Sequence, residues 1–355
     1  MTTLEFCHEL EFSKINFFER KIRITHPKTI ISGPPKSGKS FLIFDYLSNY
    51  NQEDYIYIDL NDYRNEKEEI EQNLEEYVFT NKIKVIILEN FEFDFKIPFC
   101  ESIIISTKEN TQLKGYKKLF LTPLDFEEYL LHDNKNQNIT QSFNNFLKNG
   151  NLPGVVNIDE IHTFNRLHDL IILINKDKTS QEILKILFLN IDEKKSLNQL
   201  YLLLKSKIKI SKDKFYEECK YFEKNKIIYL IEKHEQKKAT KKIYSYNPAF
   251  LSAITHKKKF KNELTNIIFC ELINKYKDIY YLDYIDFFIP SEKLAIVSIP
   301  FFNSFMMQSQ LKKIYKIVDE YKIKELFIIT VSNNEQFFHE NIEINVLPFY
   351  EWSLS

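Results

Sequence analysis

Short apolar runs alternate with amphipathic stretches along the first third of the chain. Each run has four or five residues, is rich in isoleucine, leucine or valine, and is bounded by polar residues. Runs of this length are typical of strands buried on both faces of a parallel sheet, with helices between them. The pattern therefore predicts an α/β fold with a doubly wound parallel sheet. The five predicted strands are Lys28–Ser32, Tyr55–Asp59, Lys84–Leu88, Ser102–Ile105 and Lys118–Leu121.

The turn after the first predicted strand carries the strongest chemical signal. Residues Gly33–Ser40 fit the phosphate-binding pattern G-x-x-x-x-G-K-[ST] at every defined position. A strand precedes this turn and a helix start, Phe41–Leu47, follows it, which is the context that the pattern requires. Glycines let main-chain N–H groups approach a polyphosphate, and a helix N-terminus adds partial positive charge. The sequence therefore predicts a P-loop NTPase core.

Within this loop, Lys39 is expected to reach the β- and γ-phosphates, and the Ser40 hydroxyl is expected to bind Mg²⁺. Gly33 and Gly38 permit the close approach of the backbone. The residues predicted to contact the nucleotide are Gly33, Pro34, Pro35, Lys36, Ser37, Gly38, Lys39, Ser40 and Phe41.

The ends of the third and fourth predicted strands supply the other candidate catalytic residues. Glu89 stands where such folds hold the acid that binds Mg²⁺, and Asn90 stands where a water-activating acid is usual. An amide can hold a water but cannot take its proton, so slow hydrolysis is expected. The alternative is that Glu92 or Asp94 acts instead of Asn90. Thr107 is placed as a γ-phosphate sensor.

Two further motifs follow the phosphate loop in a fixed order. They are Pro-Leu-x-Phe-x-Glu at Pro123–Glu128 and Gly-Asn-Leu-Pro-Gly-Val at Gly150–Val155. With these motifs and a weaker similarity at its C-terminal end, the chain resembles the AAA-like archaeal-type ATPases over nearly its whole length. The resemblance implies ATP and Mg²⁺ as ligands, and it implies a C-terminal region of unknown function.

Two departures from that family bear on turnover. The family usually has Asp-Glu where this chain has Glu89-Asn90, and Gly-Arg where it has Gly115-Tyr116. Loss of the arginine removes a candidate charge for the transition state, for which Lys117 or Lys118 could substitute. ATP binding is therefore better supported than ATP hydrolysis.

Apolar spacing predicts helices after the sheet and then a winged helix. Three candidate helices, Glu182–Leu189, Leu197–Leu204 and Lys212–Asn225, precede two candidate strands, Ile227–Ile231 and Lys242–Tyr246. Three helices and a hairpin make a winged helix, and the family resemblance puts one here too. The predicted domains are an ATP-binding core (1–130), a helical lid (131–176), a winged helix (177–254) and a degenerate endonuclease-like domain (255–355).

Charge is informative locally rather than globally, because the net charge of the chain is −1. Between Lys205 and Lys261 the sequence holds 17 lysines and six acids. A basic winged helix is suited to double-stranded DNA, although lysine is also the default surface residue of this composition. The absence of arginine there weakens base readout. The candidate DNA contacts are Lys212, Lys214, Lys237, Lys238, Lys241 and Lys242.

The last hundred residues resemble the restriction-endonuclease-like domain at the end of the same family. Such domains hold metal with an Asp and, on the next strand, with a Glu two residues before a Lys. Asp286 matches the first acid, but Ile296-Val297-Ser298 stands where Glu-x-Lys is needed. The predicted domain is therefore catalytically inactive. The alternative, an active nuclease, would use Asp283 with Glu271 or Glu292.

The cysteines, Cys7, Cys100, Cys219 and Cys270, are widely spaced, which argues against a zinc site or a disulfide framework and favours a reducing compartment. No run approaches the roughly 20 apolar residues of a membrane span, and the first residues do not read as a signal peptide. A soluble cytoplasmic protein is expected. A second class of function remains open, a regulatory or scaffold protein that binds another protein or forms a homo-oligomer.

Overall fold

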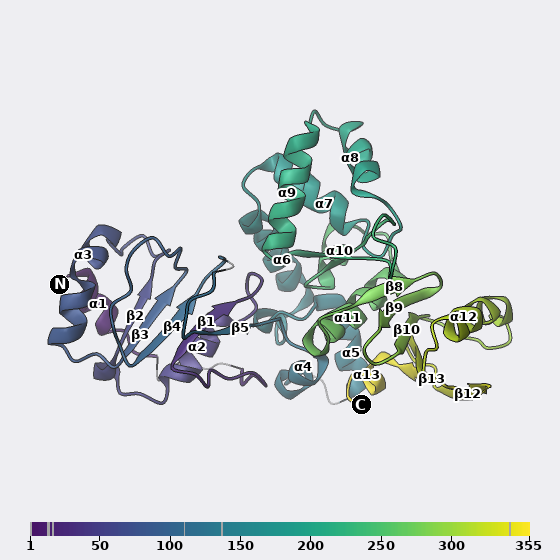
Figure 1. Ribbon diagram of the computed structural model, residues 1–355, viewed down its shortest axis with the longest axis horizontal. Coiled ribbons are helices and arrows are strands. Elements are labelled where there is room, and N and C mark those ends of the chain that lie inside the picture. The colour runs from purple at the N-terminus through teal and green to yellow at the C-terminus, as the bar shows by residue number, and fades with distance from the viewer. Residues whose placement is uncertain (1, 13–14, 16–17, 110, 136–137, 341) are drawn as a thin grey trace. The chain divides into compact units, whose positions relative to one another are not determined.

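Two large sheets, each with its own core, divide the chain into two compact units, Met1–Pro123 and Leu124–Ser355. The structure is a computed structural model that describes residues 2–12, 15, 18–109, 111–135, 138–340 and 342–355. Figure 1 labels most of the helices and strands of both units.

The first unit is built on a five-stranded sheet in the order β2-β3-β4-β1-β5. All four strand pairs are parallel, and every residue of β3 and β4 is buried. The predicted α/β class and parallel sheet are thereby confirmed, with strand ends shifted by one residue at most. The strands are β1 (Lys28–Ser32), β2 (Tyr55–Asp59), β3 (Val85–Glu89), β4 (Ser102–Ser106) and β5 (Lys117–Phe120).

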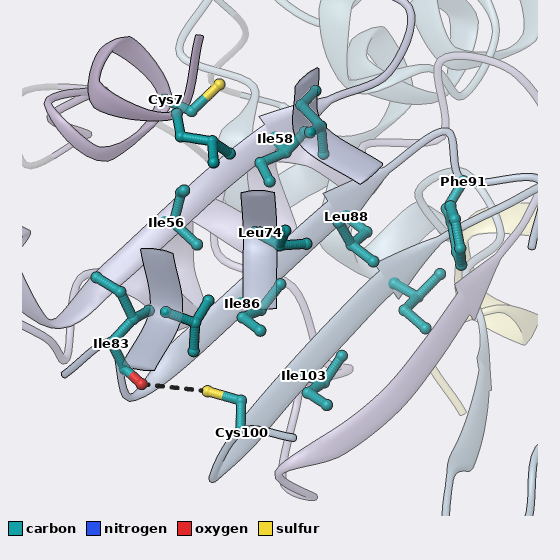
Figure 2. Packing of buried hydrophobic residues seen from close by; sticks show 14 of the residues in the cluster. Cys7, Ile56, Ile58, Leu74, Ile83, Ile86, Leu88, Phe91, Cys100 and Ile103 are labelled. Atoms are coloured by element: carbon teal, nitrogen blue, oxygen red, sulfur yellow. Dashed lines mark hydrogen bonds between the residues drawn. The ribbon is translucent and has the colours of Figure 1, made fainter. Parts of the chain in front are cut away.

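One face of this sheet packs against α3, whose apolar side chains recur every four residues at Ile70, Leu74 and Val78. Figure 2 shows Leu74 over the strand residues Ile58 and Ile86. The charged run in this segment therefore forms the outer face of an amphipathic helix. The helices of the first unit are α1 (Thr3–His8), α2 (Lys39–Leu47) and α3 (Lys67–Thr80), with a 3₁₀ turn at Gln52–Asp54.

The opposite face packs against α2, the helix that begins in the phosphate loop. Leu42 and Ile43 of α2 lie in one core with the strand residues Ile31, Ile87 and Ile104. The residue directly before each of these three strand residues belongs to the other core, on the α3 side of the sheet. Side chains of a strand alternate between faces, so burial on both faces fixes the register of each strand. The carboxyl ends of β1, β3 and β4 consequently meet at one edge with the start of α2.

The second unit begins with helices and a two-stranded antiparallel sheet of β6 and β7. Three helices and this hairpin occur in the predicted order. No helix in the described ranges combines the length and the apolar character needed to cross a bilayer. The elements are α4 (Phe126–His132), α5 (Ile139–Asn149), a 3₁₀ turn (Pro153–Val155), α6 (Glu160–Ile174), α7 (Lys178–Phe188), α8 (Leu197–Lys205), α9 (Lys212–Lys224), β6 (Ile228–Ile231), β7 (Lys242–Ser245) and α10 (Ala249–Ile254).

A six-stranded mixed sheet completes the second unit in the order β12-β13-β11-β10-β9-β8. The apolar runs of this region predict three strands, Ile285–Ile289, Leu294–Ile299 and Glu325–Val331, which correspond to β9, β10 and β11. The sequence pattern missed β8, β12 and β13, of which β8 and β12 are the edge strands. In β12 only two of the five residues are even partly buried, so its pattern lacks a continuous apolar run. The elements are α11 (Phe260–Lys275), β8 (Tyr280–Leu282), β9 (Ile285–Ile289), β10 (Leu294–Ser298), α12 (Gln308–Glu320), β11 (Glu325–Thr330), β12 (Glu335–His339), β13 (Ile342–Pro348) and α13 (Phe349–Trp352).

The motifs of the family resemblance outside the phosphate loop have packing roles in the second unit. Phe126 lies 5.6 Å from Phe349 between ring centroids, so the second motif meets the C-terminal segment. A Cβ at Gly150 would lie 2.1 Å from the Oδ1 atom of Asn247, and Asn151 Nδ2 donates to the Tyr246 carbonyl. These residues therefore stabilise the unit rather than line a reaction site.

Candidate functional site

The backbone of the phosphate loop adopts conformations and close contacts that require glycine at Gly33 and favour it at Gly38. A Cβ at Gly33 would lie 2.2 Å from the carbonyl oxygen of Leu121, the residue after β5, so no larger residue fits there unless that backbone moves. Gly38 precedes α2 with a φ of 101°, and Lys36 has a φ of 61°. Positive φ values are costly for residues with a side chain, so the loop stores some strain at Lys36.

Lys39 lies across this loop. Its ammonium donates to the carbonyls of Gly33 and Pro34, each at 3.0 Å. Burial lowers the pKa of Lys39 to about 8, with Lys108 acting in the same direction and Glu89 opposing it. Carbonyl oxygens carry only partial negative charge, so phosphate oxygens would be stronger partners for this partly buried ammonium group.

The two residues predicted to bind Mg²⁺ lie in direct contact. The Ser40 hydroxyl donates to one carboxylate oxygen of Glu89, and the Tyr57 hydroxyl donates to the other. Glu89 is 5 % exposed, and burial raises its pKa while these two hydrogen bonds oppose the rise. Tyr57 was not singled out by sequence reasoning, because an aromatic residue in a buried strand is usually core.

This arrangement fits a magnesium ion held by few protein ligands. Mg²⁺ usually binds one or two carboxylates and takes its other ligands from phosphate and water. Ser40 and Glu89 would be the protein side of such a shell. In the described part of the chain, no three His, Cys, Asp or Glu residues gather into a metal site made of protein alone. The ion would supply charge neutralisation of the phosphates.

The remaining predicted catalytic residues lie at the same edge. Asn90 Nδ2 donates to Asp59 Oδ1 at 2.8 Å. Thr107 is buried, its N–H donates to the Ile31 carbonyl at 3.1 Å, and its hydroxyl oxygen accepts from the Glu109 N–H at 3.0 Å. The structure therefore places Thr107 next to the strand that enters the phosphate loop.

The loop acids offered as alternatives to Asn90 point away from the core of the unit. Glu92 and Asp94 are exposed, and Asp94 forms an ion pair with Lys67. The alternating phenylalanines between and beside them pack inward against the sheet. The acid that does reach Asn90 is Asp59.

Arg20 forms hydrogen bonds to the phosphate loop, and no sequence motif predicted a role for this residue. The side chain is 7 % exposed and donates to the carbonyls of Ser37 (2.9 Å), Thr122 (2.9 Å) and Pro123 (3.2 Å). Hydrogen bonds from a charged donor are each worth about 1.5–3 kcal/mol. Arg20 therefore ties the loop to the last residues of the first unit.

The segment that replaces the family's Gly-Arg does not bring a charge to the phosphate edge. Tyr116 packs against the core under α3. Lys117 pairs in register with Thr29 in β1, which lies three residues, about 10 Å, before Ser32 at the loop end of that strand. The charges of Lys108 and Lys36 do act at this edge, since both lower the pKa of Lys39.

The predicted DNA contacts fall into three groups. Lys212, Lys237 and Lys238 are exposed. Lys214 pairs with Glu218 at 2.8 Å and Asp177 at 3.4 Å, and Lys241 pairs with Glu232 at 2.7 Å. Lys242 is buried at 4 % exposure, so its prediction as a surface contact to phosphates is corrected.

Lys242 belongs to a buried ionic cluster with Asp286, the residue predicted to match a nuclease acid. Its ammonium lies 3.0 Å from Asp286 Oδ1 and 2.6 Å from Asp192 Oδ1. Lys261 reaches Asp286 at 3.2 Å, and the Ser298 N–H donates to the other oxygen of Asp286 at 2.9 Å. Burial raises the pKa of Asp286, but the two ammonium groups outweigh it and hold the pKa low.

The acids of the alternative, active nuclease have other partners. Glu271 accepts the Phe126 N–H at 2.9 Å, which satisfies the start of α4. Asp283 pairs with Lys233 at 2.7 Å and with Lys194 at 3.4 Å. Glu292 is exposed. The described residues give no support to a metal site formed by these acids.

Comparisons with known proteins do not assign the chain to a family. No family model matches it. The chain is 23 % identical, over 391 aligned positions, to an uncharacterized protein of Methanocaldococcus jannaschii, an alignment that covers 92 % of this chain and 88 % of that protein. It is similar to the solved structure of a Walker-type ATPase of Pyrococcus abyssi, with a TM-score of 0.45, 13 % identity, and coverage of 69 % of this chain and 99 % of the other.

Proposed function

We propose that the first unit binds ATP with Mg²⁺ and hydrolyses it slowly. The observation that carries the proposal is the meeting of Lys39 and Ser40 from the loop with Glu89 from β3 at one strand edge. ATP is chosen over other nucleotides from the resemblance to AAA-like ATPases. Since Asn90 cannot accept a proton, turnover is expected to stay below about 1 per second without a partner.

Calorimetric titration of the purified chain with ATP tests this proposal. We expect saturable binding that weakens by about tenfold or more when Mg²⁺ is removed with EDTA. Ser40→Ala should keep the binding measured without metal and lose most of the gain that Mg²⁺ gives. Wild-type affinity that is indifferent to Mg²⁺ would contradict the assignment of Ser40 and Glu89.

For the second unit we propose a winged helix that contacts double-stranded DNA. The proposal is supported by three helices, α7, α8 and α9, followed by an antiparallel hairpin, and by the exposed Lys212, Lys237 and Lys238. Lys242 no longer belongs to the proposed surface. Lysine contacts to phosphates are sequence-independent and strongly salt-dependent.

Fluorescence anisotropy with a short duplex measures this salt dependence. Wild-type affinity should fall steeply between about 50 and 200 mM salt, and Lys237→Gln with Lys238→Gln should reduce the log–log slope by about two. Lys257→Gln with Lys258→Gln is the matched control, since these adjacent lysines are also exposed but lie outside the hairpin. Equal slopes for both double variants would exclude the hairpin as the contact.

A scaffold function that uses a protein partner is favoured by a specific observation. Acids outside the lysine-rich span, Asp177, Asp192, Asp283 and Asp286, pair with lysines inside it. The local excess of positive charge counted along the sequence is therefore smaller in the folded unit. Absence of any duplex binding at low salt would select this second function.

We further propose that the endonuclease-like part of the second unit is catalytically inactive. The Lys242 ammonium lies between Asp192 and Asp286, where a metal would need both carboxylates. A cation already held there with good geometry competes with a divalent ion for the same oxygens. The proposal also rests on Ile296-Val297-Ser298, which offers no metal-binding side chain beyond one hydroxyl.

A further inference from the structure

Asn90 and Asp59 form a hydrogen-bonded pair at the phosphate edge that no motif predicted. We propose that Asn90 holds the water that attacks the γ-phosphate and that Asp59 is the positioning residue that orients Asn90. This inference rests on the proposed function of the first unit. It explains how the site could hydrolyse ATP without the carboxylate that usually activates the attacking water.

Contacts of the residues directly before and after Asn90 bring it to the phosphate edge. Glu89, directly before it, accepts the hydroxyl of Ser40 in the phosphate loop. Phe91, directly after it, donates its N–H to the Ser106 carbonyl at 3.0 Å, one residue before Thr107. Asn90 therefore lies between the loop helix and the strand of the proposed γ-phosphate sensor.

Asp59 is held firmly enough to orient a neighbour. It ends β2 and pairs in register with Glu89 in β3. The next residue, Leu60, donates its N–H to the Glu89 carbonyl at 3.0 Å, and the Asn61 N–H donates to Asp59 Oδ1 at 2.9 Å. The carboxylate is thus fixed by the sheet on one side and by its own turn on the other.

The chemistry of this pair decides which way the Asn90 amide faces. An ionised carboxylate only accepts hydrogen bonds, so the amide atom that faces Asp59 must be the NH₂ group. The distance of 2.8 Å between Nδ2 and Oδ1 agrees with this assignment. The amide oxygen is then left for another donor, such as a water. Asn90 also has a φ of 58°, a conformation that asparagine tolerates better than most residues.

In the proposed step, a water donates one hydrogen bond to the Asn90 amide oxygen. Its oxygen forms the new bond to the γ-phosphorus while the bond from phosphorus to the β–γ bridging oxygen breaks. The proton of the water passes to a γ-phosphate oxygen, because the Asn90 amide cannot accept it. The products are ADP and phosphate, and no other reactant is needed. Positioning without proton transfer is consistent with slow turnover.

Single-turnover hydrolysis and Mg-ATP calorimetry on the full chain test the pair together. Asp59→Ala and Asn90→Ala should each lower the hydrolysis rate by about 10–100-fold and leave the Mg-ATP affinity within about twofold. The double variant should be no slower than either single variant, since the two residues act as one unit. Asp59→Asn, which keeps an acceptor oxygen, should recover much of the rate.

Asp62→Ala is the matched control, because it removes an acid from the same turn that pairs with Arg64 instead. It should leave the rate unchanged. Additive effects in the double variant or an unchanged rate in Asp59→Ala overturn the inference alone. A wild type that binds Mg-ATP without turnover overturns the inference together with the hydrolysis part of the proposed function. A wild type that does not bind Mg-ATP overturns the proposed function instead. If Asp59→Ala does not fold, Asp59→Leu takes its place, because it is close to aspartate in size and also removes the acceptor; it should lower the rate by the same factor, and an unchanged rate would overturn the inference.

Discussion

Lys39→Ala is expected to lower the affinity for Mg-ATP by about 100-fold or more. The substitution removes the cation that lies across the loop, together with its bonds to Gly33 and Pro34. Hydrogen bonds to a charged group contribute about 1.5–3 kcal/mol each, and a triphosphate would receive at least one or two from this ammonium. Isothermal calorimetry at a fixed Mg²⁺ concentration measures the loss.

Lys96→Ala is the control for charge, because it removes an exposed lysine of the same unit that pairs with Glu75 at 3.6 Å and is not among the residues predicted to contact the nucleotide. It should change the affinity only a few-fold. The pKa of Lys39 is about 8, so its ammonium form is lost as the pH rises through that value. Wild-type affinity should therefore fall between about pH 7 and pH 9, and Lys39→Ala should lack this fall. Equal losses in both variants would place the phosphates elsewhere.

Lys242→Ala is expected to destabilise the second unit by about 3–5 kcal/mol. The substitution leaves Asp192 and Asp286 buried, with the half-exposed Lys261 as the remaining nearby cation of the cluster. Removing one partner of a buried ion pair costs more than the pair itself contributes, because the other charge keeps its desolvation penalty. Urea unfolding followed by the fluorescence of Trp352 measures the change, since the single tryptophan of the chain lies in this unit.

Lys241→Ala is the matched control one residue away. Lys241 pairs with Glu232 at 2.7 Å on the surface, where such a pair contributes about 0–1 kcal/mol. Its Trp352 transition should shift little. A Lys242→Ala variant that unfolds at the same urea concentration as Lys241→Ala would show that the cluster is not a stabilising element.

The first unit was predictable because its signals are local. Each strand is a short apolar run, and the phosphate loop needs only a strand before it and a helix after it, so β1 and α2 follow from about twenty consecutive residues. Glu89 could be placed because parallel strands end at a common edge. The position of Thr107 at this edge could be predicted for the same reason, and its role as a γ-phosphate sensor stays a prediction.

The partners of these residues could not be read from the sequence, because they depend on contacts between distant segments. Arg20 donates to a residue 102 positions away, and Lys242 meets an aspartate 44 positions away. A count of lysines along the chain treats all of them as surface residues, whereas the fold buries Lys242 and pairs Lys214. A net charge counted over one stretch of sequence overestimates the surface charge when acids from other segments pair with its lysines in the folded protein.

The hydrogen bonds of Arg20 also suggest how nucleotide binding at the phosphate loop could affect the end of the first unit. One guanidinium group connects the Ser37 carbonyl with those of Thr122 and Pro123, after which the chain leaves the first unit. Gly33 abuts the Leu121 carbonyl in the same stretch. Packed atoms leave little free space between them, so a shift of about a few tenths of an ångström in the loop backbone when phosphates bind would also displace Leu121–Pro123. The displacement would pass through the Arg20 hydrogen bonds and the Gly33 contact and would not need the strands of the sheet to move.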